Sequence, residues 1–185
     1  MAVGNMPYDC VKALVEAYPD ALQKTESSYN RLPLHCACRK HAQLEVVDYI
    51  VKKWPDACLQ PDSLDRVPLH YALSNGADFA IVELLVKTRP DSAKAQDHKG
   101  WSPAHVAANL AADEKVMKLL LEANPEVVLT KTNRGHSIRA VIPKQISNQN
   151  GLKTIVTETK EQVEAKVNLP TLRKKSLNPD HMNML

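Results

Sequence analysis

The sequence is dominated by one six-residue motif that returns at a constant interval. Val67 to Ala72, which reads Val-Pro-Leu-His-Tyr-Ala, has counterparts 35 residues earlier at Leu32 to Ala37 and 35 residues later at Ser102 to Ala107. A degraded fourth copy, Ser137 to Ile142, keeps the interval. Self-similarity at one fixed period is typical of a repeat array, in which each unit buries its apolar face against its neighbours. A chain of 185 residues with a single Phe can therefore fold without one large central core.

Each copy of the motif is predicted to open a short helix that is followed by a longer one. Pro33, Pro68 and Pro103 hold the first helical position, where the fixed φ is already helical and the missing amide hydrogen costs nothing. The longer helices are expected at residues 8–18, 45–54, 79–89 and 114–124, each ended by a proline, because proline cannot continue a helix. Two columns of apolar residues are predicted to form the core between repeats: Val11, Val47, Val82 and Met117, and Leu14, Ile50, Leu85 and Leu120.

A tight turn is predicted before each short helix. The residues three positions before each proline, or before its equivalent Ile138, all tolerate positive φ: Asn30, Asp65, Gly100 and Gly135. The position just before the helix should provide a cap. Ser102 and Ser137 can accept a bond from the first amides of their helices, whereas Leu32 and Val67 cannot.

The residues from Asp97 to Ala107, Asp-His-Lys-Gly-Trp-Ser-Pro-Ala-His-Val-Ala, resemble the ankyrin repeat pattern Asp-x-x-Gly-x-Thr-Pro-Leu-His-x-Ala. Asp62 to Ala72 matches it with Asp65 in place of Gly and Val67 in place of Thr. The resemblance covers residues 9–142 and implies an all-α ankyrin-repeat solenoid of stacked helix-turn-helix units. Two features depart from the family. The period is 35 residues rather than about 33, and Pro-Asp or Pro-Glu replaces the Gly-Ala that normally follows the second helix.

The predicted organisation has three parts. Residues 1–31 form an N-terminal half repeat or cap, residues 32–142 form the repeats with the last one degraded, and residues 143–185 form a weak C-terminal capping helix followed by a basic tail. Disorder is expected in this tail beyond Pro170. Because the apolar pattern of Val11, Leu14 and Val15 matches the internal repeats, it favours a fragment of a longer array, such as the regulatory or targeting segment of a multidomain protein, over a true cap.

Composition and charge limit the function and the location that the sequence supports. The net charge of +3, from 24 basic and 21 acidic residues, is too balanced to argue for nucleic acid by itself. No apolar run approaches the roughly 18 residues of a membrane helix, so membrane insertion is not expected. The four cysteines show no disulfide framework, and the N-terminus shows no secretory signal, so we expect free thiols and a cytoplasmic location. The basic run 173–175 leaves the nucleus open as a second location.

His35, His70 and His105 lie in register, which raises the question of a metal or catalytic row. Equivalent positions on packed helices are separated by about 8–10 Å, whereas zinc ligands lie about 2 Å from one ion. This geometry argues against a shared metal. The family resemblance implies that each imidazole instead bonds to neighbouring backbone and holds the turn.

An enzymatic function has no positive support in the sequence. There is no nucleophile elbow, phosphate-binding loop or metalloprotease motif, so no catalytic residue, cofactor, metal or small-molecule substrate is predicted. A zinc site built from Cys36 and Cys38 with His35 and His41 is the rival interpretation. We favour the interpretation that these cysteines act as small apolar residues packed between helices.

The resemblance implies a non-catalytic protein-binding module whose partner lies on the concave face made by the turn tips and first helices. Carried over position by position, the partner-binding residues are Tyr29, Arg31, Arg39, Lys40, Ser63, Leu64, Arg66, Ser74, Asn75, His98, Lys99, Trp101, Asn109, Asn133, Arg134 and His136, together with Ser28 and Leu110. None of them is acidic and six are Lys or Arg, which predicts a partner with an acidic segment.

Two questions about this face stay open in the sequence. Trp101 is the sharpest candidate because Trp is enriched among residues that dominate interface energy, but an indole at a turn can also simply cover the adjacent hairpin. Tyr71 is a lesser candidate. A basic nucleic-acid-binding face is the third class of function, and it predicts a steep salt dependence.

Overall fold

The computed structural model describes residues 6–144 and 149–175, and for residues 168–175 it describes the backbone alone. The first helices of the repeats are α2 (Pro33–Arg39), α4 (Pro68–Ser74), α6 (Pro103–Asn109) and α8 (Ile138–Val141). The second helices are α1 (Tyr8–Ala17), α3 (Leu44–Lys53), α5 (Phe79–Thr88), α7 (Glu114–Ala123) and α9 (Gln149–Lys175). Helices and turns, with one isolated β-bridge between Lys131 and Ser137, make up the described part of the chain.

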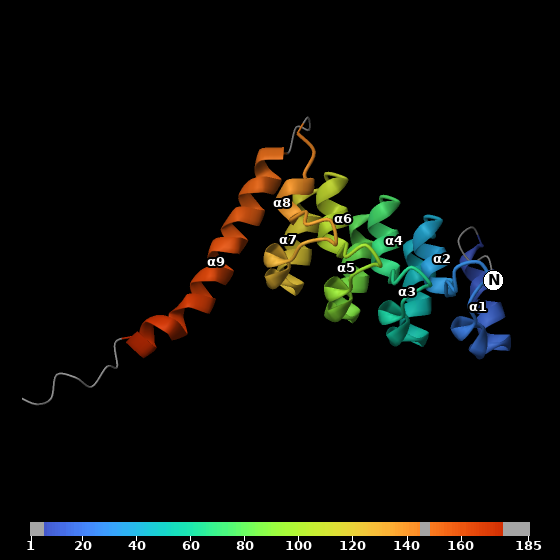
Figure 1. Cartoon of the computed structure of the whole chain (residues 1–185). Coiled ribbons are helices and arrows are strands. Elements are labelled where there is room, and N and C mark those ends of the chain that lie inside the picture. Colours follow the sequence, from blue (N-terminus) through green and yellow to red (C-terminus); the bar gives the residue numbers. More distant parts are fainter. Residues whose placement is uncertain (1–5, 145–148, 176–185) are drawn as a thin grey trace, which may run out of the picture.

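The helices stack in two parallel rows. α2, α4, α6 and α8 contact one another in order, and α1, α3, α5, α7 and α9 do the same. Figure 1 shows the first row along the top of the molecule and the second along its lower edge, with α9 closing the C-terminal end. The expected all-α solenoid is therefore confirmed, and the predicted second helices agree with the observed ones to within one residue at each end.

Each proline that ends a second helix also starts a 3₁₀ helix. These segments are η2 (Pro19–Gln23), η3 (Pro55–Leu59), η4 (Pro90–Lys94) and η5 (Pro125–Leu129). Proline is suited to this first position because its φ is fixed near the helical value. The Pro-Asp and Pro-Glu pairs that depart from the family pattern thus build one extra turn between each repeat and the next.

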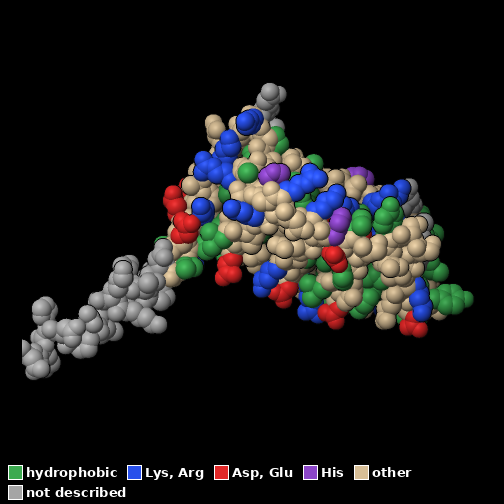
Figure 2. Space-filling model, in the orientation of Figure 1, with side chains coloured by type: hydrophobic (Ala, Val, Ile, Leu, Met, Phe, Trp, Pro, Cys, Tyr) green, Lys and Arg blue, Asp and Glu red, His purple; other side chains and the backbone are tan. Residues whose placement is uncertain are grey.

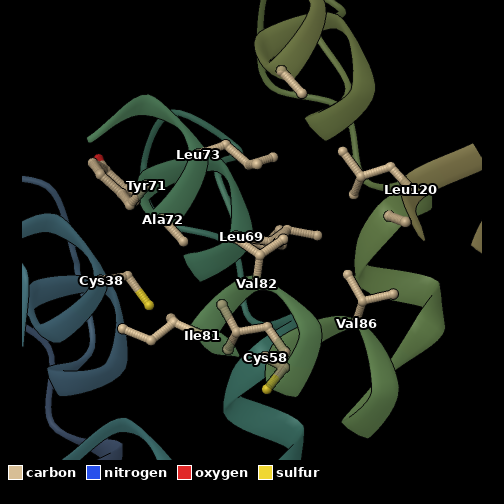
Figure 3. Packing of buried hydrophobic residues seen from close by; sticks show 14 of the residues in the cluster. Cys38, Cys58, Leu69, Tyr71, Ala72, Leu73, Ile81, Val82, Val86 and Leu120 are labelled. Atoms are coloured by element: carbon tan, nitrogen blue, oxygen red, sulfur yellow. The ribbon is translucent and has the colours of Figure 1, made fainter. Parts of the chain in front are cut away.

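The core runs the length of the array between the two rows. All but one of the eight residues in the two predicted columns are buried to within 1% exposure, and Figure 3 shows Val82 and Leu120 among their apolar neighbours. The exception is Leu14, which is only half-buried. No first helix precedes α1 within residues 6–144, so this side chain lacks the neighbour that covers Ile50, Leu85 and Leu120.

The C-terminal helix is longer than the sequence suggested. α9 continues through Pro170 to Lys175, where the sequence predicts the start of a disordered tail, and the rest of that tail lies outside the described residues. Leu152 and Val156 are buried where α9 packs on α7 and η5. In the described part of the chain, no helix combines the length and the apolar character needed to cross a bilayer.

Candidate functional site on the turn face

An acidic side chain closes each of three turns: Glu26 before α2, Asp62 before α4 and Asp97 before α6. The Oδ1 of Asp97 accepts the amides of Lys99 and Trp101, both at 2.9 Å, and the Oδ1 of Asp62 accepts the amides of Leu64 and Arg66 at 2.8 and 3.0 Å. The four residues expected at positive φ have it: Asn30 (54°), Asp65 (58°), Gly100 (75°) and Gly135 (79°). The turns before α4 and α6 are therefore held by the Asp and the positive-φ residue of the motif.

Hydrogen bonds join the turns into a continuous row. The amide of Ser63 donates to the carbonyl of Tyr29 at 2.8 Å, and that of His98 donates to the carbonyl of Leu64 at 3.1 Å. The amide of Asn133 donates to the carbonyl of Lys99 at 3.0 Å. Side chains of corresponding turn positions are thereby held at regular intervals. We call the surface formed by these turns and the exposed side of α2, α4 and α6 the turn face.

Two of the three histidines in register, His35 and His70, link their repeat to the next, whereas the Nε2 of His105 is buried without a hydrogen-bond partner among the described residues. Nδ1 of His70 accepts the amide of Val67 at 3.2 Å, and its Nε2 lies 2.9 Å from the carbonyl of Trp101. His35 repeats this with Leu32 at 3.1 Å and with Arg66 at 2.9 Å. Since Nδ1 accepts, the proton is on Nε2, which donates to the carbonyl of the following turn. The expected role of these imidazoles in holding the turn by backbone bonds agrees with this geometry for His35 and His70.

The histidines are held in the neutral form. Burial lowers the pKa of His35 to about 4, and burial likewise lowers the pKa of His70 and of His105. The imidazoles of His35 and His70 also accept the amide of the residue just before the helix, Leu32 and Val67, and these two helices have no side-chain cap on their first amides. Of the two serines expected to cap, Ser102 accepts the amide of His105 at 3.3 Å, whereas Ser137 makes no such bond and that prediction is wrong.

A depression of about 530 Å³ lies in the C-terminal half of the turn face. Trp101, Val106 and Leu110 provide its apolar lining, and Arg66, Lys99 and Arg134 provide its basic lining. Nine of the sixteen predicted partner-binding residues line it: Arg66, Ser74, His98, Lys99, Trp101, Asn109, Asn133, Arg134 and His136. The structure adds His70, Asp97 and Val106, which the sequence did not single out as binding residues because their motif positions indicate a scaffold role.

The remaining predicted residues lie outside this depression. They are Tyr29, Arg31, Arg39, Lys40, Ser63, Leu64 and Asn75. Two of the six basic side chains are already paired within the chain. Arg31 forms an ion pair with Glu26 at 2.9 Å and thereby helps to hold the pKa of that carboxyl at about 2, and Arg66 lies 3.8 Å from Asp97. The other four, Arg39, Lys40, Lys99 and Arg134, are exposed and form no ion pair with any described residue.

The two aromatic candidates differ. Trp101 is half-buried, lines the depression and packs edge-on against His105 with 6.2 Å between the ring centroids. Tyr71 is 6% exposed, and its hydroxyl donates to Oδ2 of Asp62 at 2.6 Å. Its suggested place on the binding surface is therefore wrong, because the side chain points into the scaffold and completes the turn.

The cysteines are all free. Cys38 and Cys58 are buried in the core, where burial raises the pKa of both thiols, and Cys36 is half-buried (Figure 3 shows Cys38 and Cys58). Across residues 6–144 and 149–167, no group of three or more His, Cys, Asp or Glu side chains is placed to hold a metal ion.

The stacked helix pairs, the hydrogen-bonded row of turns and the depression beside Trp101 define a helical-repeat solenoid. Residues 34–86 match the family model of ankyrin repeats (many copies), and the chain accordingly contains ankyrin repeats and folds as an ankyrin-repeat solenoid. Ankyrin repeats are generally protein–protein interaction modules and are typically non-catalytic. No curated protein sequence matches the chain with significance.

Proposed function

We propose that the chain is a non-catalytic binding module whose turn face holds an acidic segment of another protein. The observation that carries this proposal is the depression beside Trp101, where an apolar lining is bordered by cations that form no ion pair with any described residue. Lys99 and Arg134 are exposed on its rim. An acidic segment with an apolar side chain would bury that side chain against the indole and bring carboxylates to the rim.

The local charge balance supports an anionic partner. Asp97 is the single acidic residue lining the depression, and its carboxylate is already used by the amides of Lys99 and Trp101 and by Arg66. Figure 2 shows how charge is distributed over this side of the molecule. Lys and Arg side chains gather over the upper row and its turns, and most of the visible Asp and Glu side chains lie along the lower edge. This distribution favours electrostatic steering of an acidic partner to the turn face.

A charge-matched pair of variants tests the proposal. The probe is a fluorescent peptide of alternating Glu and Leu, compared with the same peptide carrying Gln in place of Glu. Lys99→Ser removes a cation from the depression, whereas Lys118→Ser removes an exposed cation from α7 and changes the net charge equally. We expect Lys99→Ser and Trp101→Ala each to weaken binding of the acidic peptide several-fold, and Lys118→Ser to leave it unchanged.

Two outcomes would refute the proposal. Equal binding of the Glu and Gln peptides would show that charge is not recognised, and equal loss in both lysine variants would show that only net charge matters. Generic duplex DNA is measured in parallel. A steep salt dependence of DNA binding, together with no binding of the acidic peptide, would support the nucleic-acid alternative instead.

A further inference from the structure

The ends of the second helices form joints with the preceding repeat on the side away from the turn face. Trp54, Arg89 and Asn124 hold the same position in three successive repeats. Arg89 forms an ion pair with Asp56 of η3. The side-chain amide of Asn124 donates to the carbonyl of Ala93 in η4 at 3.3 Å. In two of these joints the chain therefore supplies a polar side chain that fills the space beside the preceding 3₁₀ helix.

The first joint is not filled in this way. A pocket of about 360 Å³ lies between α1, η2 and α3, which are at the N-terminal end of the array in Figure 1. Trp54 and Tyr49 line it together with Val15, Leu22, Glu16, Asp20 and Lys53. Trp54 thus stands at the repeat position of Arg89 and lines an open pocket, so the joint has an aromatic wall and no internal partner for the carboxylate.

The carboxylate left without a partner is Asp20. It corresponds to Asp56, which is paired with Arg89, and to Asp91, which is paired with Lys94 at 2.7 Å. Asp20 forms no ion pair with any described residue, and Gln23 stands where η4 has Lys94. Glu126 is the acidic residue that follows the proline of η5, and it too forms no ion pair with any described residue. The residue one period after Asn124 is Thr159, so the joint beside Glu126 has no aromatic wall.

Three further observations concern Tyr49. Its ring packs edge-on against Tyr8, with 5.7 Å between centroids, and the amino group of Lys53 lies 5.6 Å from its centroid. Its hydroxyl is buried and has no hydrogen-bond partner among the described residues. The pocket therefore already holds one cation near an aromatic ring, and the acidic groups that line it, Glu16 and Asp20, outnumber that cation.

We propose that this pocket binds an arginine side chain from a basic segment of a partner protein. The chain itself provides the template, because Arg89 occupies the corresponding space beside Asp56. A planar guanidinium can stack on the indole of Trp54 and donate to the carboxylate of Asp20 at the same time, which a lysine ammonium does less well. This site lies on a different face from the proposed acidic-partner site, so the two proposals stand independently.

Nuclear magnetic resonance titration of the whole chain tests this site. The probe is the peptide acetyl-Gly-Ser-Arg-Ser-Gly-amide, and the control peptide carries citrulline, which has the same shape without the charge. We expect the arginine peptide to shift the amide signals of residues 16–23 and 49–54, and the citrulline peptide to leave them in place. Asp20→Asn should weaken binding about two- to fivefold, the range for an exposed ion pair. Trp54→Arg should abolish binding, because its own guanidinium would reach Asp20.

Three results would overturn the proposal. They are the absence of shifts in the natural sequence, equal shifts with the citrulline peptide, and unchanged affinity in Asp20→Asn with a native helical circular dichroism spectrum. The acidic peptide of the preceding section is titrated into the same samples. Its binding should survive Asp20→Asn, so failure of one site is distinguishable from failure of the other.

Discussion

The Nε2 of His70 lies 2.9 Å from the carbonyl oxygen of Trp101, a residue of the following repeat. The same ring accepts the amide of Val67 through Nδ1, so one buried side chain bonds to the residue before its own helix and holds the turn that bears the proposed contact residue. Scaffold and binding surface are therefore coupled through a single imidazole. Protonation of Nδ1 would remove its acceptor and place a charge in the core.

Stability should fall with acid in a window set by these histidines. The unfolded pKa is about 6.5, whereas in the folded chain the pKa of His35 is about 4 and the pKa values of His70 and His105 are also lowered. Below pH 6.5 the unfolded chain binds more protons than the folded one. The histidine contribution is thus fully present above about pH 6.5 and is lost as the pH falls toward 4. For His35 alone the shift corresponds to about 3 kcal/mol.

Urea unfolding followed by circular dichroism at pH 7.5, 6.0 and 5.0 measures this loss. Glu26, with a pKa of about 2, contributes little to the change within this range. His98→Gln alters an exposed imidazole and should keep the full pH dependence, whereas His35→Gln should be less stable at pH 7.5 and show a smaller decline. A free energy of unfolding that stays constant between pH 7.5 and 5.0 would contradict the prediction.

The bond between Tyr71 and Asp62 should be measurable as a coupling energy. The hydroxyl is buried and donates at 2.6 Å, and the carboxylate also receives the amides of Leu64 and Arg66. Tyr71→Phe should cost about 1–3 kcal/mol, because it leaves Oδ2 of Asp62 without this donor in a buried place. A double-mutant cycle with Asp62→Asn should give an interaction energy of about 0.5–3 kcal/mol. Strictly additive effects of the two changes would show that the residues do not act together.

Two glycines with the same backbone conformation should differ in their tolerance of alanine. Gly100 and Gly135 have φ of 75° and 79°, so both substitutions carry the backbone cost of about 1–2 kcal/mol. At Gly100 an added Cβ would also lie 2.9 Å from the backbone nitrogen of Asn133, whereas at Gly135 it meets nothing within 4 Å. Gly100→Ala should therefore be the more destabilising by about 1–3 kcal/mol. Equal thermal unfolding midpoints would refute the proposed close approach of the two turns.

The sequence predicted the repeated scaffold well because each of its signals is local. The proline at the first helical position, the positive-φ residue and the apolar columns recur every 35 residues, and all three have direct physical causes. A second column of positive φ was missed: His41 (54°), Gly76 (67°) and Ala111 (54°) follow the short helices. Only one of these is glycine, so residue type gave no common signal, and tertiary packing imposes the conformation.

The binding surface was harder to predict because it depends on which side chains meet across repeats. Sequence position placed Arg31 and Arg66 among available cations, but Glu26 and Asp97 already pair with them. The pocket beside Trp54 could not be anticipated, since it arises where an indole replaces the cation that Arg89 supplies one repeat later. Such differences between equivalent joints become visible only when the repeats are compared in three dimensions.

Leucines in one column should differ in stability cost according to what covers them. Leu85 is fully buried between repeats, whereas Leu14 in the equivalent position of α1 is half-buried because no first helix packs on it within the described residues. Leu85→Ala should cost about 3–5 kcal/mol through lost burial and the cavity left behind, and Leu14→Ala about 1–2 kcal/mol. Urea unfolding of the two variants under identical conditions measures the difference. If Leu14→Ala were as damaging as Leu85→Ala, the side chain would have to be covered in solution by a neighbour that the described residues do not provide.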